Sequence, residues 1–154
     1  MKIKAFLIII ILPFLLGNRQ SSPDRIPYSK IIEKYKGNLI YVDMWASWCK
    51  PCRSEIKKMK KIKEKYPNIV YLYITMDLDR EACAKAIKKD GIIDESKNYF
   101  IIDIIKDEKY NEIKSDKSIP HYLLYNEKGE LVNTNAPRPS NKELIIELDK
   151  YLKH

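Results

Sequence analysis

The order of apolar and polar residues divides much of this chain into strand-like runs and amphipathic helical segments. Continuous apolar, β-branched and aromatic runs at residues 39–45 and 69–76 are typical of buried strands. The segment between them, from about residue 51 to 66, carries apolar side chains at three- and four-residue steps, namely Ile56, Met59, Ile62 and Tyr66. This period predicts a helix with one apolar face. A strand, a helix and a strand in this order predict a parallel βαβ unit.

The second half of the chain predicts further elements around this unit. Residues 79–89 form an expected helix whose inward side chains are Ala82, Ala86 and Ile87. The apolar run at residues 99–105 predicts core or an added strand, followed by a charged helical patch through about residue 113. Residues 122–125 and 131–132 predict the two strands of a hairpin.

A capping-box spacing from Ser140 to Glu143 predicts the start of a last helix. Its expected buried side chains are Leu144, Ile145, Leu148 and Leu152.

The chain has 154 residues, enough for one domain with a single well-packed core. Its formal charge is +8, but the basic residues are spread through helical segments and interleaved with acids. This pattern favours a solvated lysine-rich surface, and we expect no nucleic-acid partner.

Residues 1–22 follow a different pattern. A short basic start with Lys2 and Lys4 precedes an almost wholly apolar run at residues 5–16, which is shorter than the roughly 20 residues that span a bilayer. This is typical of a secretory signal peptide. No good small-x-small cleavage site follows, so an uncleaved N-terminal anchor that tethers the chain through residues 5–16 is the alternative. Both predict export to the periplasm or cell envelope.

Residues 23–38 contain Pro23, Pro27 and Gly37 around a short helical patch at 28–35. We interpret them as a linker and N-terminal extension that leads into a domain at residues 39–154.

The strand at residues 39–45 leads directly into Trp48-Cys49-Lys50-Pro51-Cys52 at the start of the predicted helix. A helix N-terminus carries partial positive charge and free N–H groups, so it stabilises a thiolate. Pro51 suits the first helical turn, where its missing N–H would have had no partner. The pattern predicts a redox-active Cys49–Cys52 disulfide that needs no other cofactor.

The remaining candidate ligands do not predict a metal site. A zinc site would need two more Cys or His ligands, and Cys83, His121 and His154 show no ligand spacing. Three cysteines are also too few for a disulfide scaffold. We expect Cys83 to be a packed thiol without a function.

Residues 42–52 resemble the thioredoxin active-site signature almost residue for residue. The export signal, residues 52–55 and the late segment 135–140 are similar to envelope thioredoxins of the TlpA/ResA type. The resemblance covers residues 39 to 152. It implies an α/β, thioredoxin-like fold, with a central mixed sheet flanked by helices.

The resemblance also implies roles for the catalytic candidates. Cys49 would be the solvent-facing nucleophile and Cys52 the buried resolving cysteine. Asp43 matches the buried acid that assists proton transfer at the second cysteine, and a carboxylate inside a strand is costly unless it is functional or paired. Glu55 matches a glutamate that follows the motif in several envelope members, and it could tune the thiols.

A second group of residues is expected to hold the partner polypeptide. Trp48, Lys50 and Pro51 surround Cys49 in the sequence. Ile119 and Pro120 match the loop whose cis-proline faces the disulfide in thioredoxins. His121 stands where thioredoxins often have threonine, and we expect it to be a surface or contact residue.

These observations predict an exported thiol–disulfide oxidoreductase, acting as a monomeric reductase of disulfide-containing exported proteins. By resemblance, a membrane thiol transporter would be its electron donor. Two alternatives stay open. One is a disulfide oxidase or isomerase, because Lys50 and Pro51 do not fix the direction of the reaction. The other is a non-enzymatic, metal-handling binding module.

Overall fold

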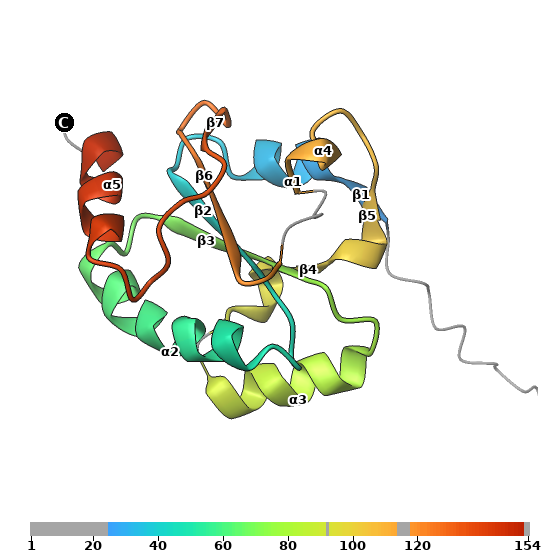
Figure 1. Cartoon of the computed structure of the whole chain (residues 1–154). Coiled ribbons are helices and arrows are strands. Elements are labelled where there is room, and N and C mark those ends of the chain that lie inside the picture. The colour runs from blue at the N-terminus through green and yellow to red at the C-terminus, as the bar shows by residue number, and fades with distance from the viewer. Residues whose placement is uncertain (1–24, 92, 114–117, 153–154) are drawn as a thin grey trace, which may run out of the picture.

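The computed structural model describes residues 25–91, 93–113 and 118–152 (Figure 1). The predictions for residues 1–22 lie outside the described residues. A five-stranded sheet forms the centre, in the order β4-β3-β2-β6-β7. Its strands are β4 Asn98–Phe100, β3 Val70–Thr75, β2 Ile40–Trp45, β6 His121–Tyr125 and β7 Leu131–Asn133. Strands β4, β3 and β2 pair in parallel, and β6 pairs antiparallel with both β2 and β7, so the predicted central mixed sheet is confirmed.

The predicted βαβ unit consists of β2, helix α2 (Lys50–Lys65) and β3. All six residues of β2 are buried, because helices cover both faces of the sheet at this strand. Asp43 pairs in register with Tyr73 on one side and Tyr122 on the other. The carboxylate is therefore held in the middle of the central strand.

Alternate residues of β2 face two separate cores. Tyr41 and Trp45 belong to the core under α2, α3 (Arg80–Asp90) and α5 (Glu143–Leu152). Ile40, Val42 and Met44 belong to the core under α1 (Tyr28–Lys34) and α4 (Tyr110–Ile113). Figure 1 shows α2 and α3 on one side of the sheet and α1 and α4 on the other. Because side chains alternate along a strand, Asp43 faces the α2 side.

Residues 26–34 are part of the folded body rather than a connection leading into it. Strand β1 (Ile26–Pro27) pairs in parallel with β5 (Ile104–Ile105). In α1, Tyr28, Ile31 and Ile32 are completely buried. The hydroxyl groups of Tyr28 and Tyr125 lie 3.1 Å apart, across 97 residues of sequence. The helical patch expected at 28–35 is thus present and covers one face of the sheet.

The segment from residue 90 to 113 contains shorter elements than its sequence pattern indicated. The apolar run 99–105 supplies the edge strand β4, a 3-10 turn and the two-residue strand β5.

In α3, Ala86 and Ile87 are buried as predicted, but Cys83 is completely buried and Ala82 only partly. Among the described residues, no helix has the length and apolar character needed to cross a membrane.

The last helix begins at Glu143, two residues later than a capping box with Ser140 as its N-cap predicts. The amide of Ser140 donates instead to Glu55 Oε2, at 2.8 Å. Asn141 acts as the cap, because its Oδ1 accepts from the amide of Glu143 at 3.0 Å. Leu144 and Leu148 are buried as predicted, whereas Ile145 and Leu152 are only partly buried.

Candidate active site

Cys49 and Cys52 form a disulfide at the start of α2, with their Cα atoms 5.3 Å apart. Cys49 is the N-cap residue of the helix, and its Sγ accepts a hydrogen bond from the amide of Cys52 at 3.2 Å. The first-turn amides of a helix carry partial positive charge. The same position therefore stabilises a thiolate on Cys49 once the disulfide is reduced.

The two sulfur-bearing residues differ slightly in exposure. Cys52 is completely buried, and Cys49 retains 4% of its surface. Cys49 was expected to face the solvent, and the structure corrects this: its neighbours cover most of it. Exposed Lys50 and Pro51 follow it, and Trp48, which precedes it, is 66% exposed. A partner must therefore lie against these side chains to reach the sulfur of Cys49.

The loop before Cys49 is fixed by Asp77, which the sequence analysis did not identify. Its carboxylate accepts hydrogen bonds from the amide of Ser47 at 2.8 Å and from the hydroxyl of Ser47 at 2.7 Å. It also accepts one from the hydroxyl of Thr75 at 2.6 Å. These bonds tie the loops after β2 and β3 together, with exposed Trp48 and Leu78 one on each loop. Strands β2 and β3 are parallel, so the loops that follow them leave the same edge of the sheet. That neighbourhood is the one feature from which the sequence could have indicated the contact between Asp77 and Ser47.

Replacing Asp77 by alanine is expected to lower the free energy of unfolding by about 1–3 kcal/mol, because a part-buried amide and two hydroxyls lose their acceptor. Urea denaturation followed by tryptophan fluorescence measures this. Asp79→Ala is the matched control, since it removes a carboxylate that caps α3 and is expected to cost about 1 kcal/mol. Equal stability of the Asp77→Ala and native proteins would contradict the assignment.

Asp43 is 1% exposed, and neither of its carboxylate oxygens has a hydrogen-bond partner among the described residues. Burial raises the pKa of this carboxyl well above its usual range, and the negative charge of Glu55 adds to the effect. The positive charge of Lys63 acts in the opposite direction. Asp43 faces the core that also contains Cys52. A carboxyl in this state binds a proton more readily than an exposed carboxyl and can exchange it with a neighbouring group.

Glu55 is 6% exposed and is held by two partners. It accepts from the amide of Ser140 at 2.8 Å and from Lys58 Nζ at 3.1 Å. Burial acts to raise its pKa, but these two partners together hold the pKa below its ordinary value. Glu55 therefore stays charged, anchors the segment before α5 and adds negative charge near Asp43.

The Ile119–Pro120 peptide bond is cis. Pro120 directly precedes β6, whose first residue His121 pairs with Met44 near the carboxyl end of β2. The loop therefore lies at the end of the sheet where the chain enters the Cys49 loop. A cleft of about 230 Å³ is lined by Pro120, Tyr122, Asn135, Ala136, Pro137, Arg138, Asn141 and Glu143. His121 was expected to be a surface or contact residue; it is 7% exposed, so the surface position is wrong, and a contact with the partner stays a prediction.

Cys83 is a completely buried free thiol, as predicted. Its Sγ lies 3.9 Å from Thr75 Oγ1 and 3.8 Å from Asn98 Nδ2. Burial raises the pKa of this thiol to about 11, which leaves little thiolate at neutral pH. Within the described ranges, no three His, Cys, Asp or Glu side chains are grouped so as to hold a metal ion.

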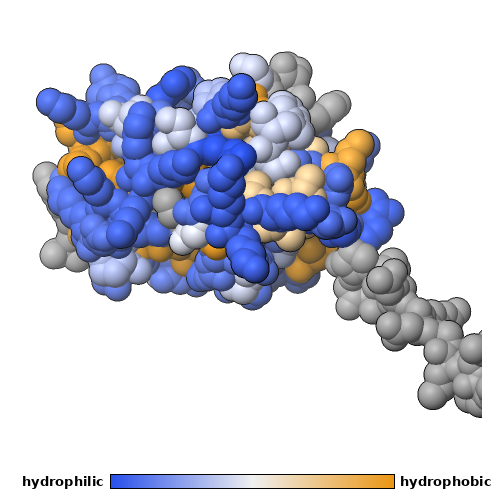
Figure 2. Space-filling model, turned by 90° about the horizontal axis from the view of Figure 1, so that it is seen from below, coloured by the Kyte–Doolittle hydropathy of each residue, from blue (hydrophilic) through white to orange (hydrophobic). Residues whose placement is uncertain are grey.

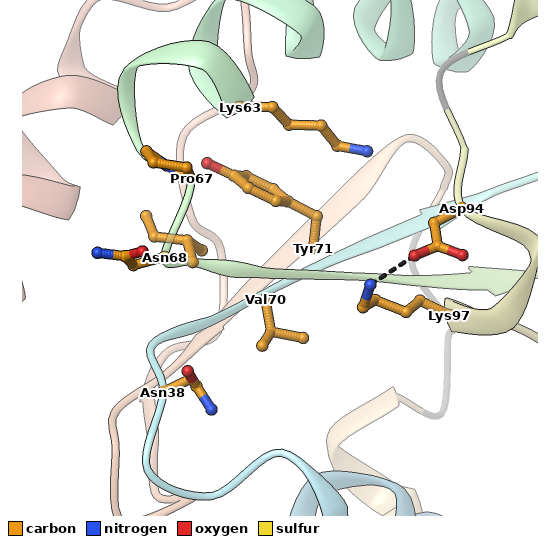
Figure 3. Close-up of a pocket in the computed structure, with 9 residues that line it drawn as sticks. Asn38, Lys63, Pro67, Asn68, Val70, Tyr71, Asp94 and Lys97 are labelled. Atoms are coloured by element: carbon orange, nitrogen blue, oxygen red, sulfur yellow. Dashed lines mark hydrogen bonds and ion pairs between the residues drawn. The ribbon is translucent and has the colours of Figure 1, made fainter.

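A hollow of about 610 Å³ lies away from the cysteines. It is open to solvent at the amino end of β3, and Figure 3 shows Asn38, Lys63, Tyr71 and the Asp94–Lys97 ion pair around it. The cysteines lie beyond the opposite, carboxyl end of β2. The redox pair therefore lies on a different part of the molecule from this hollow.

A central mixed sheet that delivers a Cys-x-x-Cys pair to the start of a helix is the arrangement of thioredoxin-type thiol–disulfide oxidoreductases. The chain belongs to the thioredoxin-like family, whose family model matches residues 37–131. The predicted similarity to the TlpA/ResA type is confirmed, since thiol-disulfide oxidoreductases ResA of two Bacillus species are among the relatives that match. Cys49 and Cys52 are its redox pair, and the protein is a thiol–disulfide oxidoreductase of this kind.

Individual relatives illustrate the match. The thioredoxin-like protein YneN of Bacillus subtilis is 25% identical over 118 residues, which cover 77% of this chain and 68% of that protein. The sporulation thiol-disulfide oxidoreductase A of the same organism is 28% identical over 101 residues, or 64% of this chain and 59% of that protein. A crystal structure assigned as a thiol-disulfide oxidoreductase from Bacteroides vulgatus is 30% identical, with a TM-score of 0.62 over 77% of this chain and 82% of that one.

Proposed function

We propose that the protein reduces disulfide bonds in exported proteins of the periplasm or cell envelope. The observation that carries the proposal is the placing of Cys49 at the N-terminus of α2, with the buried acid Asp43 facing the core that holds Cys52. This provides an attacking thiolate next to the exposed residues Trp48, Lys50 and Pro51, and a proton acceptor inside. The basic and apolar pattern of residues 1–22 supports export.

The reaction would proceed in two exchanges. In the reduced protein, the Cys49 thiolate attacks one sulfur of the client disulfide, so that a Cys49–client bond forms and the client bond breaks. The leaving client sulfur takes up a proton. Cys52 then gives its proton to Asp43, and its sulfur attacks Sγ of Cys49. The Cys49–Cys52 bond forms, and the second client sulfur leaves and is protonated.

The electrons and protons that move in the two exchanges define what the client must accept and what an electron donor must supply. The client gains two electrons from the protein and two protons, one from solvent at the first exchange and one passed from Cys52 through Asp43 at the second. A dithiol electron donor in the membrane would then return two electrons, restoring the Cys49 thiolate and the protonated Cys52, and Asp43 would again be free to accept a proton. Trp48, Lys50 and Pro51, with the Ile119–Pro120 loop, would contact the client backbone near the exchanged bond. The protein would act as a monomer.

The reduction potential of the full chain tests this direction. Redox buffers set the poise, and the fluorescence of Trp45 and Trp48 reports the state of the disulfide; Cys83→Ala removes the third thiol. We expect a value near or below the thioredoxin level of about −270 mV. A value near about −120 mV would make the protein a disulfide donor and overturn the reductase proposal. Stoichiometric copper binding through Cys49 without any reversible dithiol couple would favour the metal-handling module.

A further inference from the structure

The positive charge of the protein is concentrated on two helices. Helices α2 and α3 together carry 12 basic and four acidic residues. The whole chain has 29 basic and 21 acidic residues, so the other 17 basic and 17 acidic residues cancel. The formal net charge of +8 is therefore that of these two neighbouring helices. The interleaving of bases and acids holds for the rest of the chain but not for this face.

Three of the four acids pair with bases of these helices, Asp90 with Arg53, Glu55 with Lys58 and Glu81 with Lys85, and several other lysines are left without a counter-charge in the part of the chain that the structure describes. Asp90 has a 3% exposed side chain that pairs with Arg53 at 2.6 Å. Glu55 is turned inward to the amide of Ser140. Among the described residues, no carboxylate lies within 4.0 Å of the amino groups of Lys50, Lys60, Lys61, Lys88 and Lys89, all of which are exposed. Figure 2 views the side on which Figure 1 places α2 and α3, with long hydrophilic side chains crossing it.

The lysines of α2 form a row that starts at the redox centre. Lys50, Lys57 and Lys61 are spaced by seven and four residues, so they lie along one side of a helix with 3.6 residues per turn. At 1.5 Å per residue the row is about 16 Å long. Lys50 is the residue next to Cys49. An extended polypeptide rises about 3.3 Å per residue, so about five residues beside a bound disulfide would cover the row.

We propose that the face of α2 and α3 recognises polypeptides that carry a short acidic segment next to the disulfide to be exchanged. The proposal rests on the proposed function and defines its substrate class. Lys57 has an exposed side chain that pairs only loosely with Asp90, at 3.7 Å, and can turn to a partner. Attraction between the lysine row and the acidic segment would raise the encounter rate and align the client disulfide with Cys49.

Other anionic partners fit this face less well. Neither helix contains Phe, Tyr or Trp, so α2 and α3 offer no side chain on which a nucleic-acid base could stack. A flat lipid surface on the face would also cover the end of the row at Lys50 and so restrict access to Cys49. A polypeptide client can occupy the row and present its disulfide at the same time.

Three synthetic peptides test the proposal with the full chain and dithiothreitol as the reductant. Each peptide has the same internal disulfide, followed by five glutamates, five lysines or five serines. We expect kcat/KM to be about tenfold higher for the acidic than for the serine peptide at about 0.01 M salt. The difference should vanish at about 1 M salt, where the Debye length falls from about 30 to about 3 Å.

The charge-reversed variant Lys61→Glu/Lys88→Glu is expected to lose this preference while reducing the serine peptide at the native rate. The control Lys36→Glu/Lys128→Glu makes the same change in net charge on exposed residues at the other end of β2, and it should keep the preference. If both variants lost the preference for the acidic peptide equally, or if the native protein showed no such preference, this inference would be overturned and the proposed function would still stand. Failure to reduce even the serine peptide would overturn the proposed function and this inference with it.

Vesicles of phosphatidylglycerol and phosphatidylcholine separate the lipid alternative. Unchanged peptide selectivity in Lys61→Glu/Lys88→Glu, with binding to the anionic vesicles lost only in that variant, would assign the face to a membrane surface and overturn the proposal. Equal vesicle binding by both variants, with the selectivity lost only in Lys61→Glu/Lys88→Glu, is the expected result.

Discussion

Replacing Cys49 by serine is expected to lower the turnover of disulfide reduction by about 10³-fold or more, because the attacking thiolate is lost. Serine keeps the N-cap of α2, since its hydroxyl can accept from the amide of Cys52 as Sγ does. The fold should therefore remain while the chemistry stops. The measurement is the dithiothreitol-driven reduction of a disulfide peptide, with the thiols released as the readout.

Two further variants make the result specific. Cys52→Ser leaves the first exchange possible and removes the second, so a covalent Cys49–client adduct should accumulate and be visible by mass spectrometry. Cys83→Ala should turn over at the native rate, because that thiol is buried and its pKa is raised to about 11. Native turnover by Cys49→Ser, or a trapped adduct on Cys83, would contradict the assignment of the redox pair.

The parts of the fold that the sequence predicted well are those with strong local patterns. The helix expected from about 51 to 66 is α2, Lys50–Lys65, and the strand expected at 39–45 is β2, Ile40–Trp45. Both lie in the buried centre of the protein, where the spacing of apolar residues along the chain matches the geometry of the helix or strand that they form. Cys49 and Cys52 could likewise be predicted, since their chemistry depends on a spacing of three and on the helix that follows.

The parts that were missed depend on contacts between distant residues. Tyr28 lies beside Tyr125, and Asp77 accepts hydrogen bonds from Ser47. The spacing of apolar residues around any one of these four does not indicate which distant residue it contacts. The charge of the α2 and α3 face was missed for a similar reason. A count along the chain includes Asp90 and Glu55, and only the fold shows that these acids are turned inward. Local patterns predict elements, while the packing of elements decides which side chains meet.

Replacing Asp43 by asparagine is expected to change how stability depends on pH. The pKa of Asp43 is raised in the folded protein above its ordinary value of 3.8, so the folded state binds this proton more tightly than the unfolded state does. Stability from this group is therefore complete below pH 3.8 and is lost as pH rises toward the folded-state pKa. The native protein should lose up to about 1.4 kcal/mol per pH unit across that window, relative to the variant.

Urea denaturation of the oxidised proteins at a series of pH values above 4 measures this difference. The asparagine amide is also buried among the same neighbours, so a constant offset between the two curves carries no information about titration. The informative quantity is the slope of the difference against pH, and Glu64→Gln, an exposed acid of α2, should give a slope near zero. Parallel curves for Asp43→Asn and the native protein would mean that Asp43 does not titrate in this range.

The same variant separates the two exchanges of the reaction. Asp43→Asn removes the acceptor for the Cys52 proton but leaves Cys49 and the N-terminus of α2 unchanged. The first exchange should therefore keep its rate, while the second slows by about 10²-fold or more, the usual contribution of a positioned base. Rapid-quench sampling would then show the mixed disulfide as a transient in Asp43→Asn at neutral pH. A second exchange as fast as in the native protein would leave the carboxyl without a part in the reaction, and its burial unexplained by proton transfer.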